Sequence, residues 1–337
     1  MDGAANPQSG SPAAGDVVLQ PQVIPAPRAA SPEARTYLST PFWAGERARL
    51  DPDDLEGWKA AIAEVDVMFA PMVTMMLDQA GGRVEKTTLG GVTVYEATPD
   101  DLPAADADKA HLYIHGGGWA FMGGAACGGQ GAQQAARLGC RTFAVDYRVP
   151  PQHRFPAALD DCLSVYEALL KTYRPGNIVI SGGSAGGNLT AAVALRIRDA
   201  GLAPPAALAL LTPATDGALQ SDTMTTNDQL DSVLKYAAMD EFWAVYAGRH
   251  DRSDPYLSPV YGDFSKGFPP TLLQSGTRDL LLSDTVRLHR ALRRAGVEAE
   301  LHVWEAMPHG GFGGAAPEDA EVTAEIRAFF SRHWGRA

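Results

Sequence analysis

One serine, Ser184, stands between Gly182 and Gly186 in a Gly-x-Ser-x-Gly pattern. The β-branched run 178–181 before it is typical of a strand, and the run 189–198 after it is typical of a helix. A sharp turn between the two strains the serine backbone and exposes its hydroxyl at a helix N-terminus, where backbone N–H groups favour negative charge. Nucleophilic acyl chemistry needs that geometry.

Glycine-rich turns between a strand and a helix also bind phosphates, so this alternative has to be weighed. The dinucleotide pattern Gly-x-Gly-x-x-Gly requires a glycine where Ser184 stands. The phosphate-loop pattern requires a lysine, whereas Gly187 is followed by Asn188. The pattern alone is a weak signal, and the rest of the chain decides.

Three consecutive glycines supply the anion-binding loop that a serine nucleophile needs. The loop 115–118, His-Gly-Gly-Gly, follows the apolar end of a predicted strand, and its N–H groups carry no side chains in the way. We expect the N–H groups of Gly117, Gly118 and Ala185 to form an oxyanion hole. His115 is expected to support the loop through hydrogen bonds rather than to act as a base.

A general base and an orienting acid follow two later strands. His309 lies in a glycine-rich loop after the predicted strand 299–304, and the other histidines have settings that suit a base less well. Asp279 comes directly after the turn that ends the predicted strand 271–275, where a carboxylate can reach the histidine. Asp284 is the second candidate acid, but its place at a helix start is typical of a cap. The predicted triad is therefore Ser184, Asp279 and His309.

Strand-like and helix-like runs alternate over most of the chain, which is typical of a mostly parallel sheet covered by helices on both faces. The predicted strands are 84–89, 92–95, 110–115, 140–146, 177–181, 206–211, 271–275 and 299–304. The predicted helices are 130–138, 155–173, 189–200, 283–295 and 317–334. The carboxyl ends of parallel strands meet at one edge of the sheet, so the three triad residues can converge there.

The first 82 residues and one long connection depart from this alternation. The predicted organisation is a disordered or extended arm over 1–32, N-terminal cap helices over 33–82, a catalytic domain over 83–211 and 256–337, and a cap insertion over 212–255. The first clear helix is expected from Asp51 to Gln79, with a break near Pro71. An amphipathic helix over 231–247 is expected inside the insertion, which would form a lid over the serine.

Composition excludes several classes of partner. The chain has 337 residues, of which 45% are hydrophobic, and a net charge of −12, so neither nucleic acid nor an anionic membrane suits it. We expect no membrane span, because no run approaches eighteen consecutive apolar residues, and no secretion signal. Cys127, Cys140 and Cys162 form no C-x-x-C pattern, which favours reduced thiols in the cytoplasm and argues against a disulfide framework or a cysteine metal site.

Four further stretches carry a resemblance to a known family. They read Asp-Tyr-Arg-Val-Pro-Pro-Gln-His-Arg-Phe-Pro-Ala-Ala over 146–158, Ser-Ala-Gly-Gly-Asn-Leu over 184–189, Asp-Pro-Tyr-Leu-Ser-Pro over 254–259 and Asp-Leu-Leu-Leu-Ser-Asp over 279–284. With the His-Gly-Gly-Gly loop, they resemble the hormone-sensitive-lipase-like bacterial esterases of the α/β-hydrolase superfamily, from about residue 84 to the C-terminus.

The resemblance implies an α/β-hydrolase fold, with a mostly parallel eight-stranded sheet, helices on both faces and a helical cap. It also implies hydrolysis of short- to medium-chain acyl esters without a cofactor or metal, and by analogy a homodimer. Three departures from the family pattern stand out: Gly183 replaces an aspartate, Gln152 replaces a glutamate, and an extra glycine separates His309 from Phe312. The first two remove charges near the site, which bears on pH optimum and loop rigidity, but none removes a catalytic group.

These observations predict a serine carboxylesterase acting on a small-molecule ester. A lactone hydrolase on the same machinery is an alternative, because cyclic esters need the same groups. A non-catalytic small-molecule receptor is a second alternative on the same scaffold. The predicted triad with its histidine counts against the receptor.

Overall fold

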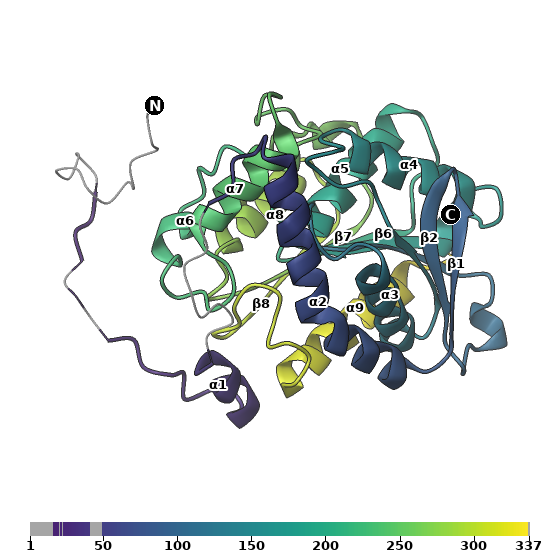
Figure 1. Ribbon diagram of the computed structural model, residues 1–337. Helices are drawn as coiled ribbons and strands as arrows, with labels where there is room; N and C mark the ends of the chain where they lie inside the picture. The colour runs from purple at the N-terminus through teal and green to yellow at the C-terminus, as the bar shows by residue number, and fades with distance from the viewer. Residues whose placement is uncertain (1–15, 20, 22, 41–48, 336–337) are drawn as a thin grey trace.

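A single eight-stranded sheet organises the part of the chain that the structure describes (Figure 1). The structure is a computed structural model that describes residues 16–19, 21, 23–40 and 49–335. The strand order is β1-β2-β4-β3-β5-β6-β7-β8. The strands are β1 (Arg83–Leu89), β2 (Val92–Thr98), β3 (Ala110–Ile114), β4 (Arg141–Val145), β5 (Ile178–Gly183), β6 (Ala207–Leu211), β7 (Thr271–Gly276) and β8 (Ala299–Trp304). The predicted α/β-hydrolase architecture is confirmed.

The sheet changes from antiparallel to parallel along its width. β1 and β2 form the expected hairpin, closed by Gly90 and Gly91 at positive φ of 59° and 81°. β2 is also antiparallel to β4, whereas every pair from β4 to β8 is parallel. The strands β3 and β7 are buried along their whole length, as strands covered on both faces must be.

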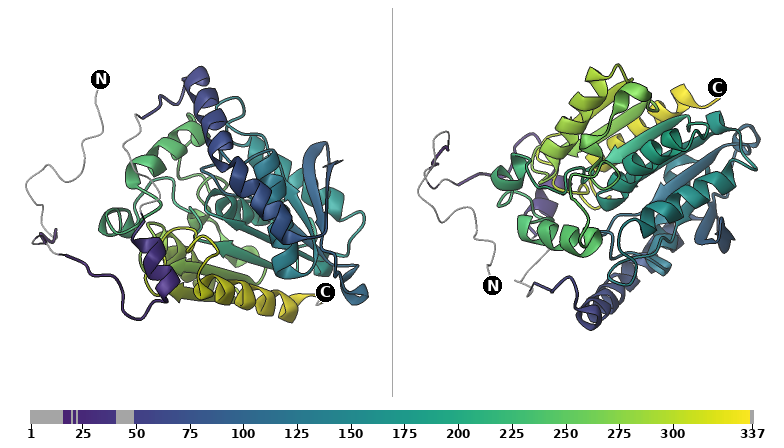
Figure 2. Two further views of the ribbon diagram at one scale, coloured as in Figure 1. Left: turned by 60° about the horizontal axis from the view of Figure 1, so that its bottom comes forward. Right: turned by 90° about the horizontal axis from the view of Figure 1, so that it is seen from above.

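Two layers of helices sandwich the sheet (Figure 2). On one face, Phe329 and Phe330 of α9 pack against Val179 of β5, and α3 lies on the same side. On the other face, α4, α5 and α8 pack against side chains of alternate parity, such as Ile180. These helices are α3 (Ala125–Leu138), α4 (Ala157–Leu169), α5 (Ala185–Asp199), α8 (Leu282–Arg294) and α9 (Pro317–His333).

A short helix near the N-terminus, α1 (Pro32–Leu38), precedes the helix that we expected to be first. Ser31 caps it by accepting from the N–H of Ala34, and its hydroxyl donates to Glu318 of α9. Tyr37 meets Phe312 edge to face, at 6.0 Å between ring centroids. Consequently α1 packs on the loop that follows β8, beside the yellow C-terminal segment in the left view of Figure 2. The predicted arm over 1–32 lies partly outside the described residues; those described in 16–29 form no helix or strand.

The long helix α2 (Leu55–Ala80) differs from the prediction at both its start and its middle. Its cap is Asp54, which accepts from the N–H of Gly57 at 2.9 Å, and not Asp51. The helix also continues through Pro71 without the expected break. The carbonyl that loses its helical partner belongs to Val67, four residues before Pro71, and Val67 is 76% exposed, so water can replace the missing donor.

Among the described residues, α2 is also the one helix long and apolar enough to cross a membrane by length and composition. Its most apolar 18-residue window has a mean hydropathy of 1.6, and 6% of that window is buried. The sequence expectation rested on consecutive apolar residues, whereas this test uses the mean over a window, so α2 meets it although isolated polar residues interrupt its apolar run. In the folded chain α2 lies along α3, with Trp58 fully buried and donating to the carbonyl of Asp51 at 3.0 Å.

The insertion between β6 and β7 carries two helices, α6 (Thr223–Thr226) and α7 (Tyr236–Ala247). The expected helix over 231–247 therefore begins five residues late. Asp231 lies in the preceding loop, where its carboxylate accepts from the N–H groups of Val233 and Leu234 at 2.8 and 3.1 Å. Such a turn competes with helix formation at these positions.

Candidate active site

The turn between β5 and α5 gives Ser184 an uncommon backbone conformation. Its φ is 55° and its ψ is −120°, which costs a non-glycine residue about 1–3 kcal/mol. The neighbouring glycines leave no room for a side chain, since a Cβ on Gly182 would lie 2.3 Å from the carbonyl oxygen of Gly186. The packing of β5 against α5 therefore imposes the strain and holds Ser184 at the apex.

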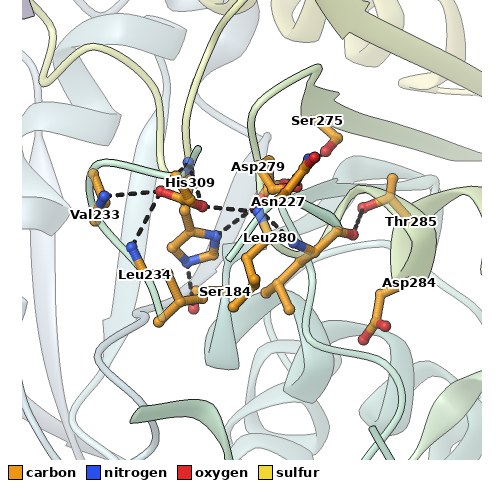
Figure 3. A network of polar contacts seen from close by, with 12 residues as sticks. Ser184, Asn227, Val233, Leu234, Ser275, Asp279, Leu280, Asp284, Thr285 and His309 are labelled. Atoms are coloured by element: carbon orange, nitrogen blue, oxygen red, sulfur yellow. Dashed lines mark hydrogen bonds and ion pairs between the residues drawn. The ribbon is translucent and has the colours of Figure 1, made fainter. Parts of the chain in front are cut away.

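The three residues of the predicted triad come together (Figure 3). Nε2 of His309 lies 2.9 Å from Oγ of Ser184, and Nδ1 of His309 lies 3.0 Å from Oδ1 of Asp279. Asp279 is fully buried and His309 is 8% exposed. Since Nδ1 faces a carboxylate, it donates to Asp279, which leaves Nε2 free to accept the proton of Ser184.

Asp279 has partners beyond the histidine. The hydroxyl of Ser275 donates to its Oδ2 at 2.6 Å, and the N–H of Leu281 donates to its Oδ1 at 2.9 Å. The side-chain amide of Asn227 donates to its backbone carbonyl at 2.9 Å. These bonds fix the carboxylate in the plane that the imidazole needs.

Opposing effects act on the pKa of His309, and the net pKa is raised. Burial lowers it, but the hydrogen bond and charge of Asp279 and then the charge of Asp231 raise it by more. The sequence did not identify Asp231 or Asn227 as part of this neighbourhood. No motif marks either residue, and Asp231 reads in the sequence as the start of a helix.

The second candidate acid, Asp284, lies in the first turn of α8 and does not reach the histidine. Its Oδ2 accepts from the N–H groups of Thr215 and Asp216 at 2.7 and 3.0 Å, and Ser221 donates to its Oδ1. Burial raises its pKa to about 7. The expected capping role is absent too, because Leu281 is the cap residue and the carboxylate bonds to the chain entering the insertion.

The glycine loop lies close to Ser184. A Cβ on Gly116 would be 2.8 Å from the carbonyl oxygen of Gly183 and 3.4 Å from Cβ of Ser184. Gly117 and Gly118 have φ of 100° and 59°, which L side chains rarely adopt. Ala185, the third expected oxyanion residue, follows Ser184 as the first residue of α5.

His115 is buried beneath this loop. Its Nδ1 lies 2.8 Å from the carbonyl oxygen of Gly116, and its ring stacks on Tyr147 at 4.1 Å between centroids. The hydroxyl of Tyr147 donates to the carbonyl of His115 at 3.0 Å. Burial lowers the pKa of His115 to about 4, so its ring is neutral at pH 7 and suits the expected supporting role.

An aromatic side chain from the insertion stands beside the glycine loop. A Cβ on Gly118 would lie 2.7 Å from the ring of Phe242 in α7. Phe242 meets Phe121 edge to face at 5.9 Å, and Phe121 lies 6.1 Å from Trp58 of α2. The neighbouring apolar residues of the insertion are core residues instead: Met224, Met239 and Trp243 are buried in the main cluster.

Two further clusters of side chains resemble functional sites, but their geometry or burial rules this out. The first resembles a metal site. His115, Cys127 and Asp146 have ligand atoms within 4.8 Å of one another, whereas a tetrahedral metal site brings its ligands to about 3.5 Å. Burial also raises the pKa of the Cys127 thiol, which opposes the thiolate that a metal needs.

A second serine–histidine pair lies inside the sheet. Nε2 of His111 is 2.7 Å from Oγ of Ser181, and both residues are buried. Burial lowers the pKa of His111 to about 3. Without access to solvent, this pair cannot meet a substrate.

Comparison with known proteins agrees with this geometry. A family model described as the alpha/beta hydrolase fold matches residues 111–312. LipR of Mycobacterium tuberculosis is 33% identical over 253 residues, which cover 74% of this chain and 80% of LipR. An esterase of Acinetobacter venetianus is 32% identical over 231 residues, which cover 67% of this chain and 75% of the esterase.

Solved structures extend the likeness to nearly the whole chain. The crystal structure of esterase E25 is similar with a TM-score of 0.84 and 35% identity, over 95% of this chain and 99% of that one. An esterase of the bacterial hormone-sensitive lipase family is similar with a TM-score of 0.78 and 30% identity, over 91% of this chain and 100% of that one. The chain therefore belongs to the α/β-hydrolase family, among the hormone-sensitive-lipase-like esterases.

Proposed function

We propose that the protein is a serine carboxylesterase that hydrolyses short- to medium-chain acyl esters. The observation that carries the proposal is the relay from Ser184 through His309 to Asp279, with contacts of 2.9 and 3.0 Å. The names of similar proteins, which include an esterase and a carboxylesterase, support the same class of reaction.

The first half of the proposed reaction acylates the serine. His309 takes the proton of Ser184 at Nε2 while Oγ attacks the ester carbonyl carbon, and Asp279 holds the imidazolium that forms. The carbonyl oxygen becomes an oxyanion that accepts from the N–H groups of Gly117, Gly118 and Ala185. The C–O bond to the alcohol then breaks, and His309 returns the proton to the departing alkoxide.

In the second half, a water molecule replaces the alcohol. His309 takes a proton from the water as its oxygen attacks the acyl carbon, and a second oxyanion forms in the same place. The bond to Oγ breaks, the proton passes from His309 to Ser184, and the carboxylic acid leaves. The enzyme returns to its starting state without a cofactor or metal.

We assign the limit on acyl length to the insertion 212–255, acting as a cap with the N-terminal helices. Phe242 supports this assignment because its ring stands beside Gly118, where the bound ester must pass. A lactone would use the same groups, and no contact in the described residues favours it over an open ester. The receptor alternative is disfavoured because the relay is intact.

Substitution of the nucleophile tests the proposal. Ser184→Ala should abolish turnover of p-nitrophenyl butyrate and labelling by a fluorophosphonate probe, with the thermal unfolding midpoint retained. Ser181→Ala is the matched control, because Ser181 also contacts a histidine but is buried in β5. Full turnover by Ser184→Ala would refute the assignment.

The cellular location and the oligomeric state of the protein are proposals as well. We propose a cytoplasmic location, since all three cysteines are free and buried, which suits a reducing compartment. The homodimer that the resemblance suggests would use the edge strand β8 and helix α9, and Val303 of β8 is an exposed apolar residue there. A molar mass measured by light scattering decides between monomer and dimer.

A further inference from the structure

Asp231 carries a buried carboxylate that the proposed reaction does not use. It lies in the loop between α6 and α7 and is 1% exposed. Burial of a carboxylate is costly unless its oxygens are hydrogen-bonded, so a buried one has a structural or chemical reason. Two of its bonds are local, to the N–H groups of Val233 and Leu234.

The other bonds of Asp231 reach both loops of the relay. Its Oδ2 accepts from the N–H of Leu280 at 2.8 Å, directly after Asp279. The same oxygen lies 3.3 Å from the backbone nitrogen of His309, which also donates to it. One carboxylate of the insertion thus joins the turn that carries the acid to the loop that carries the base.

Neutral contacts from the insertion reinforce the same turn. The hydroxyl of Thr223 donates to the carbonyl of Leu280 at 2.8 Å and accepts from the N–H of Ser283 at 2.9 Å. Asn227 donates to the carbonyls of Thr277 and Asp279. These residues can hold the turn but bring no charge, so Asp231 is distinct among them.

Several charged or titratable groups face this place from the surrounding elements. Asp279 comes from the turn after β7, Tyr37 from α1, and Asp319 from α9, where it accepts from N–H groups of the loop after His309. The ammonium group of Lys235 donates to the backbone carbonyl of Asp231 at 2.6 Å. Among these groups, Asp231 is the one whose carboxylate accepts from backbone N–H groups of both loops, at Leu280 and at His309.

We propose that Asp231 is a positioning residue for ester hydrolysis: it fixes the two relay loops in register and adds a second negative charge that stabilises the imidazolium of His309. The inference rests on the proposed function. The charge of Asp231 is among the causes that raise the pKa of His309, which agrees with the geometry. Nothing in the motifs of the chain assigns this role to the insertion.

The pH profile separates this role from a merely structural one. His309 must be neutral to act as a base, so kcat/KM rises with pH through its pKa. In Asp231→Asn the lost charge should lower that pKa and move the acidic limb of the profile down by about half a unit or more. We also expect kcat to fall about tenfold, because the imidazolium loses part of its compensation. An unmoved limb, or one moved upward, would overturn the proposal.

Two further variants keep the experiment decisive. Thr223→Val is the matched control, because it removes two hydrogen bonds to the same turn without removing a charge, and its acidic limb should stay in place. Asp231→Ser keeps a hydroxyl acceptor for the local turn and replaces the asparagine variant if that fails to fold; the same downward shift is expected. A limb that moves equally in Thr223→Val would show a general loosening and contradict the inference.

The outcome is separable from that of the proposed function. If Ser184→Ala keeps its activity, the esterase assignment fails. If Ser184→Ala is inactive and the limb of both Asp231 variants stays unmoved, the assignment stands and only the role of Asp231 is withdrawn.

Discussion

Asp279 meets a donor on each of its sides, which distinguishes it from an ordinary exposed carboxylate. His309 and Leu281 donate to one oxygen, and Ser275 donates to the other. A neutral amide at this position would present an N–H where one of these donors now points. The choice of acceptor atoms therefore sets the tautomer of His309.

We predict that Asp279→Asn lowers kcat by about 10³- to 10⁴-fold, because His309 then presents a proton to Ser184 instead of a lone pair. Steady-state kinetics with p-nitrophenyl butyrate measure the loss. Asp284→Asn is the comparison, and its kcat should stay within about threefold of the parent, since Asp284 makes no contact with the relay. Similar losses in the two variants would contradict the assignment of the acid.

Residue types and spacing were sufficient to predict this relay, because glycine-rich turns after strands are local signals. Asp231 could not be found in the same way. Its role depends on a loop that folds back over Leu280 and His309, which lie 49 and 78 residues away in the chain. The sequence around it has apolar spacing typical of a helix, and the tertiary bonds outweigh that local preference.

At the scale of elements, the parallel strands explain why the fold was predictable. Each parallel strand was predicted within two residues at its ends, whereas the antiparallel strand β2 extends three residues further than predicted, to Thr98. Helix starts were less predictable. The start of α3 at Ala125 lies in a glycine-rich run that has little helix propensity, and packing against β2 and β4 stabilises it.

Asp284, at the junction between α8 and the insertion, makes the free energy of unfolding depend on pH. The pKa of Asp284 is about 7 in the fold against an ordinary 3.8. As pH rises between these values, the unfolded chain loses this proton first, so the fold binds more protons and its free energy of unfolding falls. The contribution of Asp284 is complete below pH 3.8 and is lost as pH passes 7.

We predict that Asp284→Asn escapes this loss. Asparagine mimics the neutral acid, accepting from Thr215 and Asp216 and donating to Ser221. The urea midpoint of the variant relative to the parent should therefore rise between about pH 4 and about pH 8. A difference that stays constant over this range would show that Asp284 does not titrate there.

The position of α7 gives a second element-scale prediction. In Phe242→Ala the space beside Gly118 opens, so kcat/KM for a p-nitrophenyl decanoate should rise relative to the acetate by about tenfold. Phe268→Ala is the control. Phe268 is also a half-buried aromatic residue, but it packs on Phe264 just before the start of β7. An unchanged ratio in Phe242→Ala would remove Phe242 from the acyl pocket.

At the scale of the molecule, the net charge of −12 biases which esters approach. A negative surface repels anionic substrates at long range, and salt screens that repulsion. We predict that kcat/KM for an anionic monoester, such as a p-nitrophenyl hemiglutarate, rises several-fold between about 20 mM and 500 mM salt. The neutral acetate should change little over the same range. Equal responses of the two esters would contradict charge steering.

Because α1 packs on the loop after His309, segments that are far apart in the sequence have to meet beside the site. On the ribosome, Ala34 is made 273 residues before Met307 and 278 residues before Phe312, its packing partners. Ser184 and its turn are made well before His309, so a nascent chain carries the serine without its histidine partner. The contact between Ser184 and His309 can form only after this late-made loop has been synthesised and has folded.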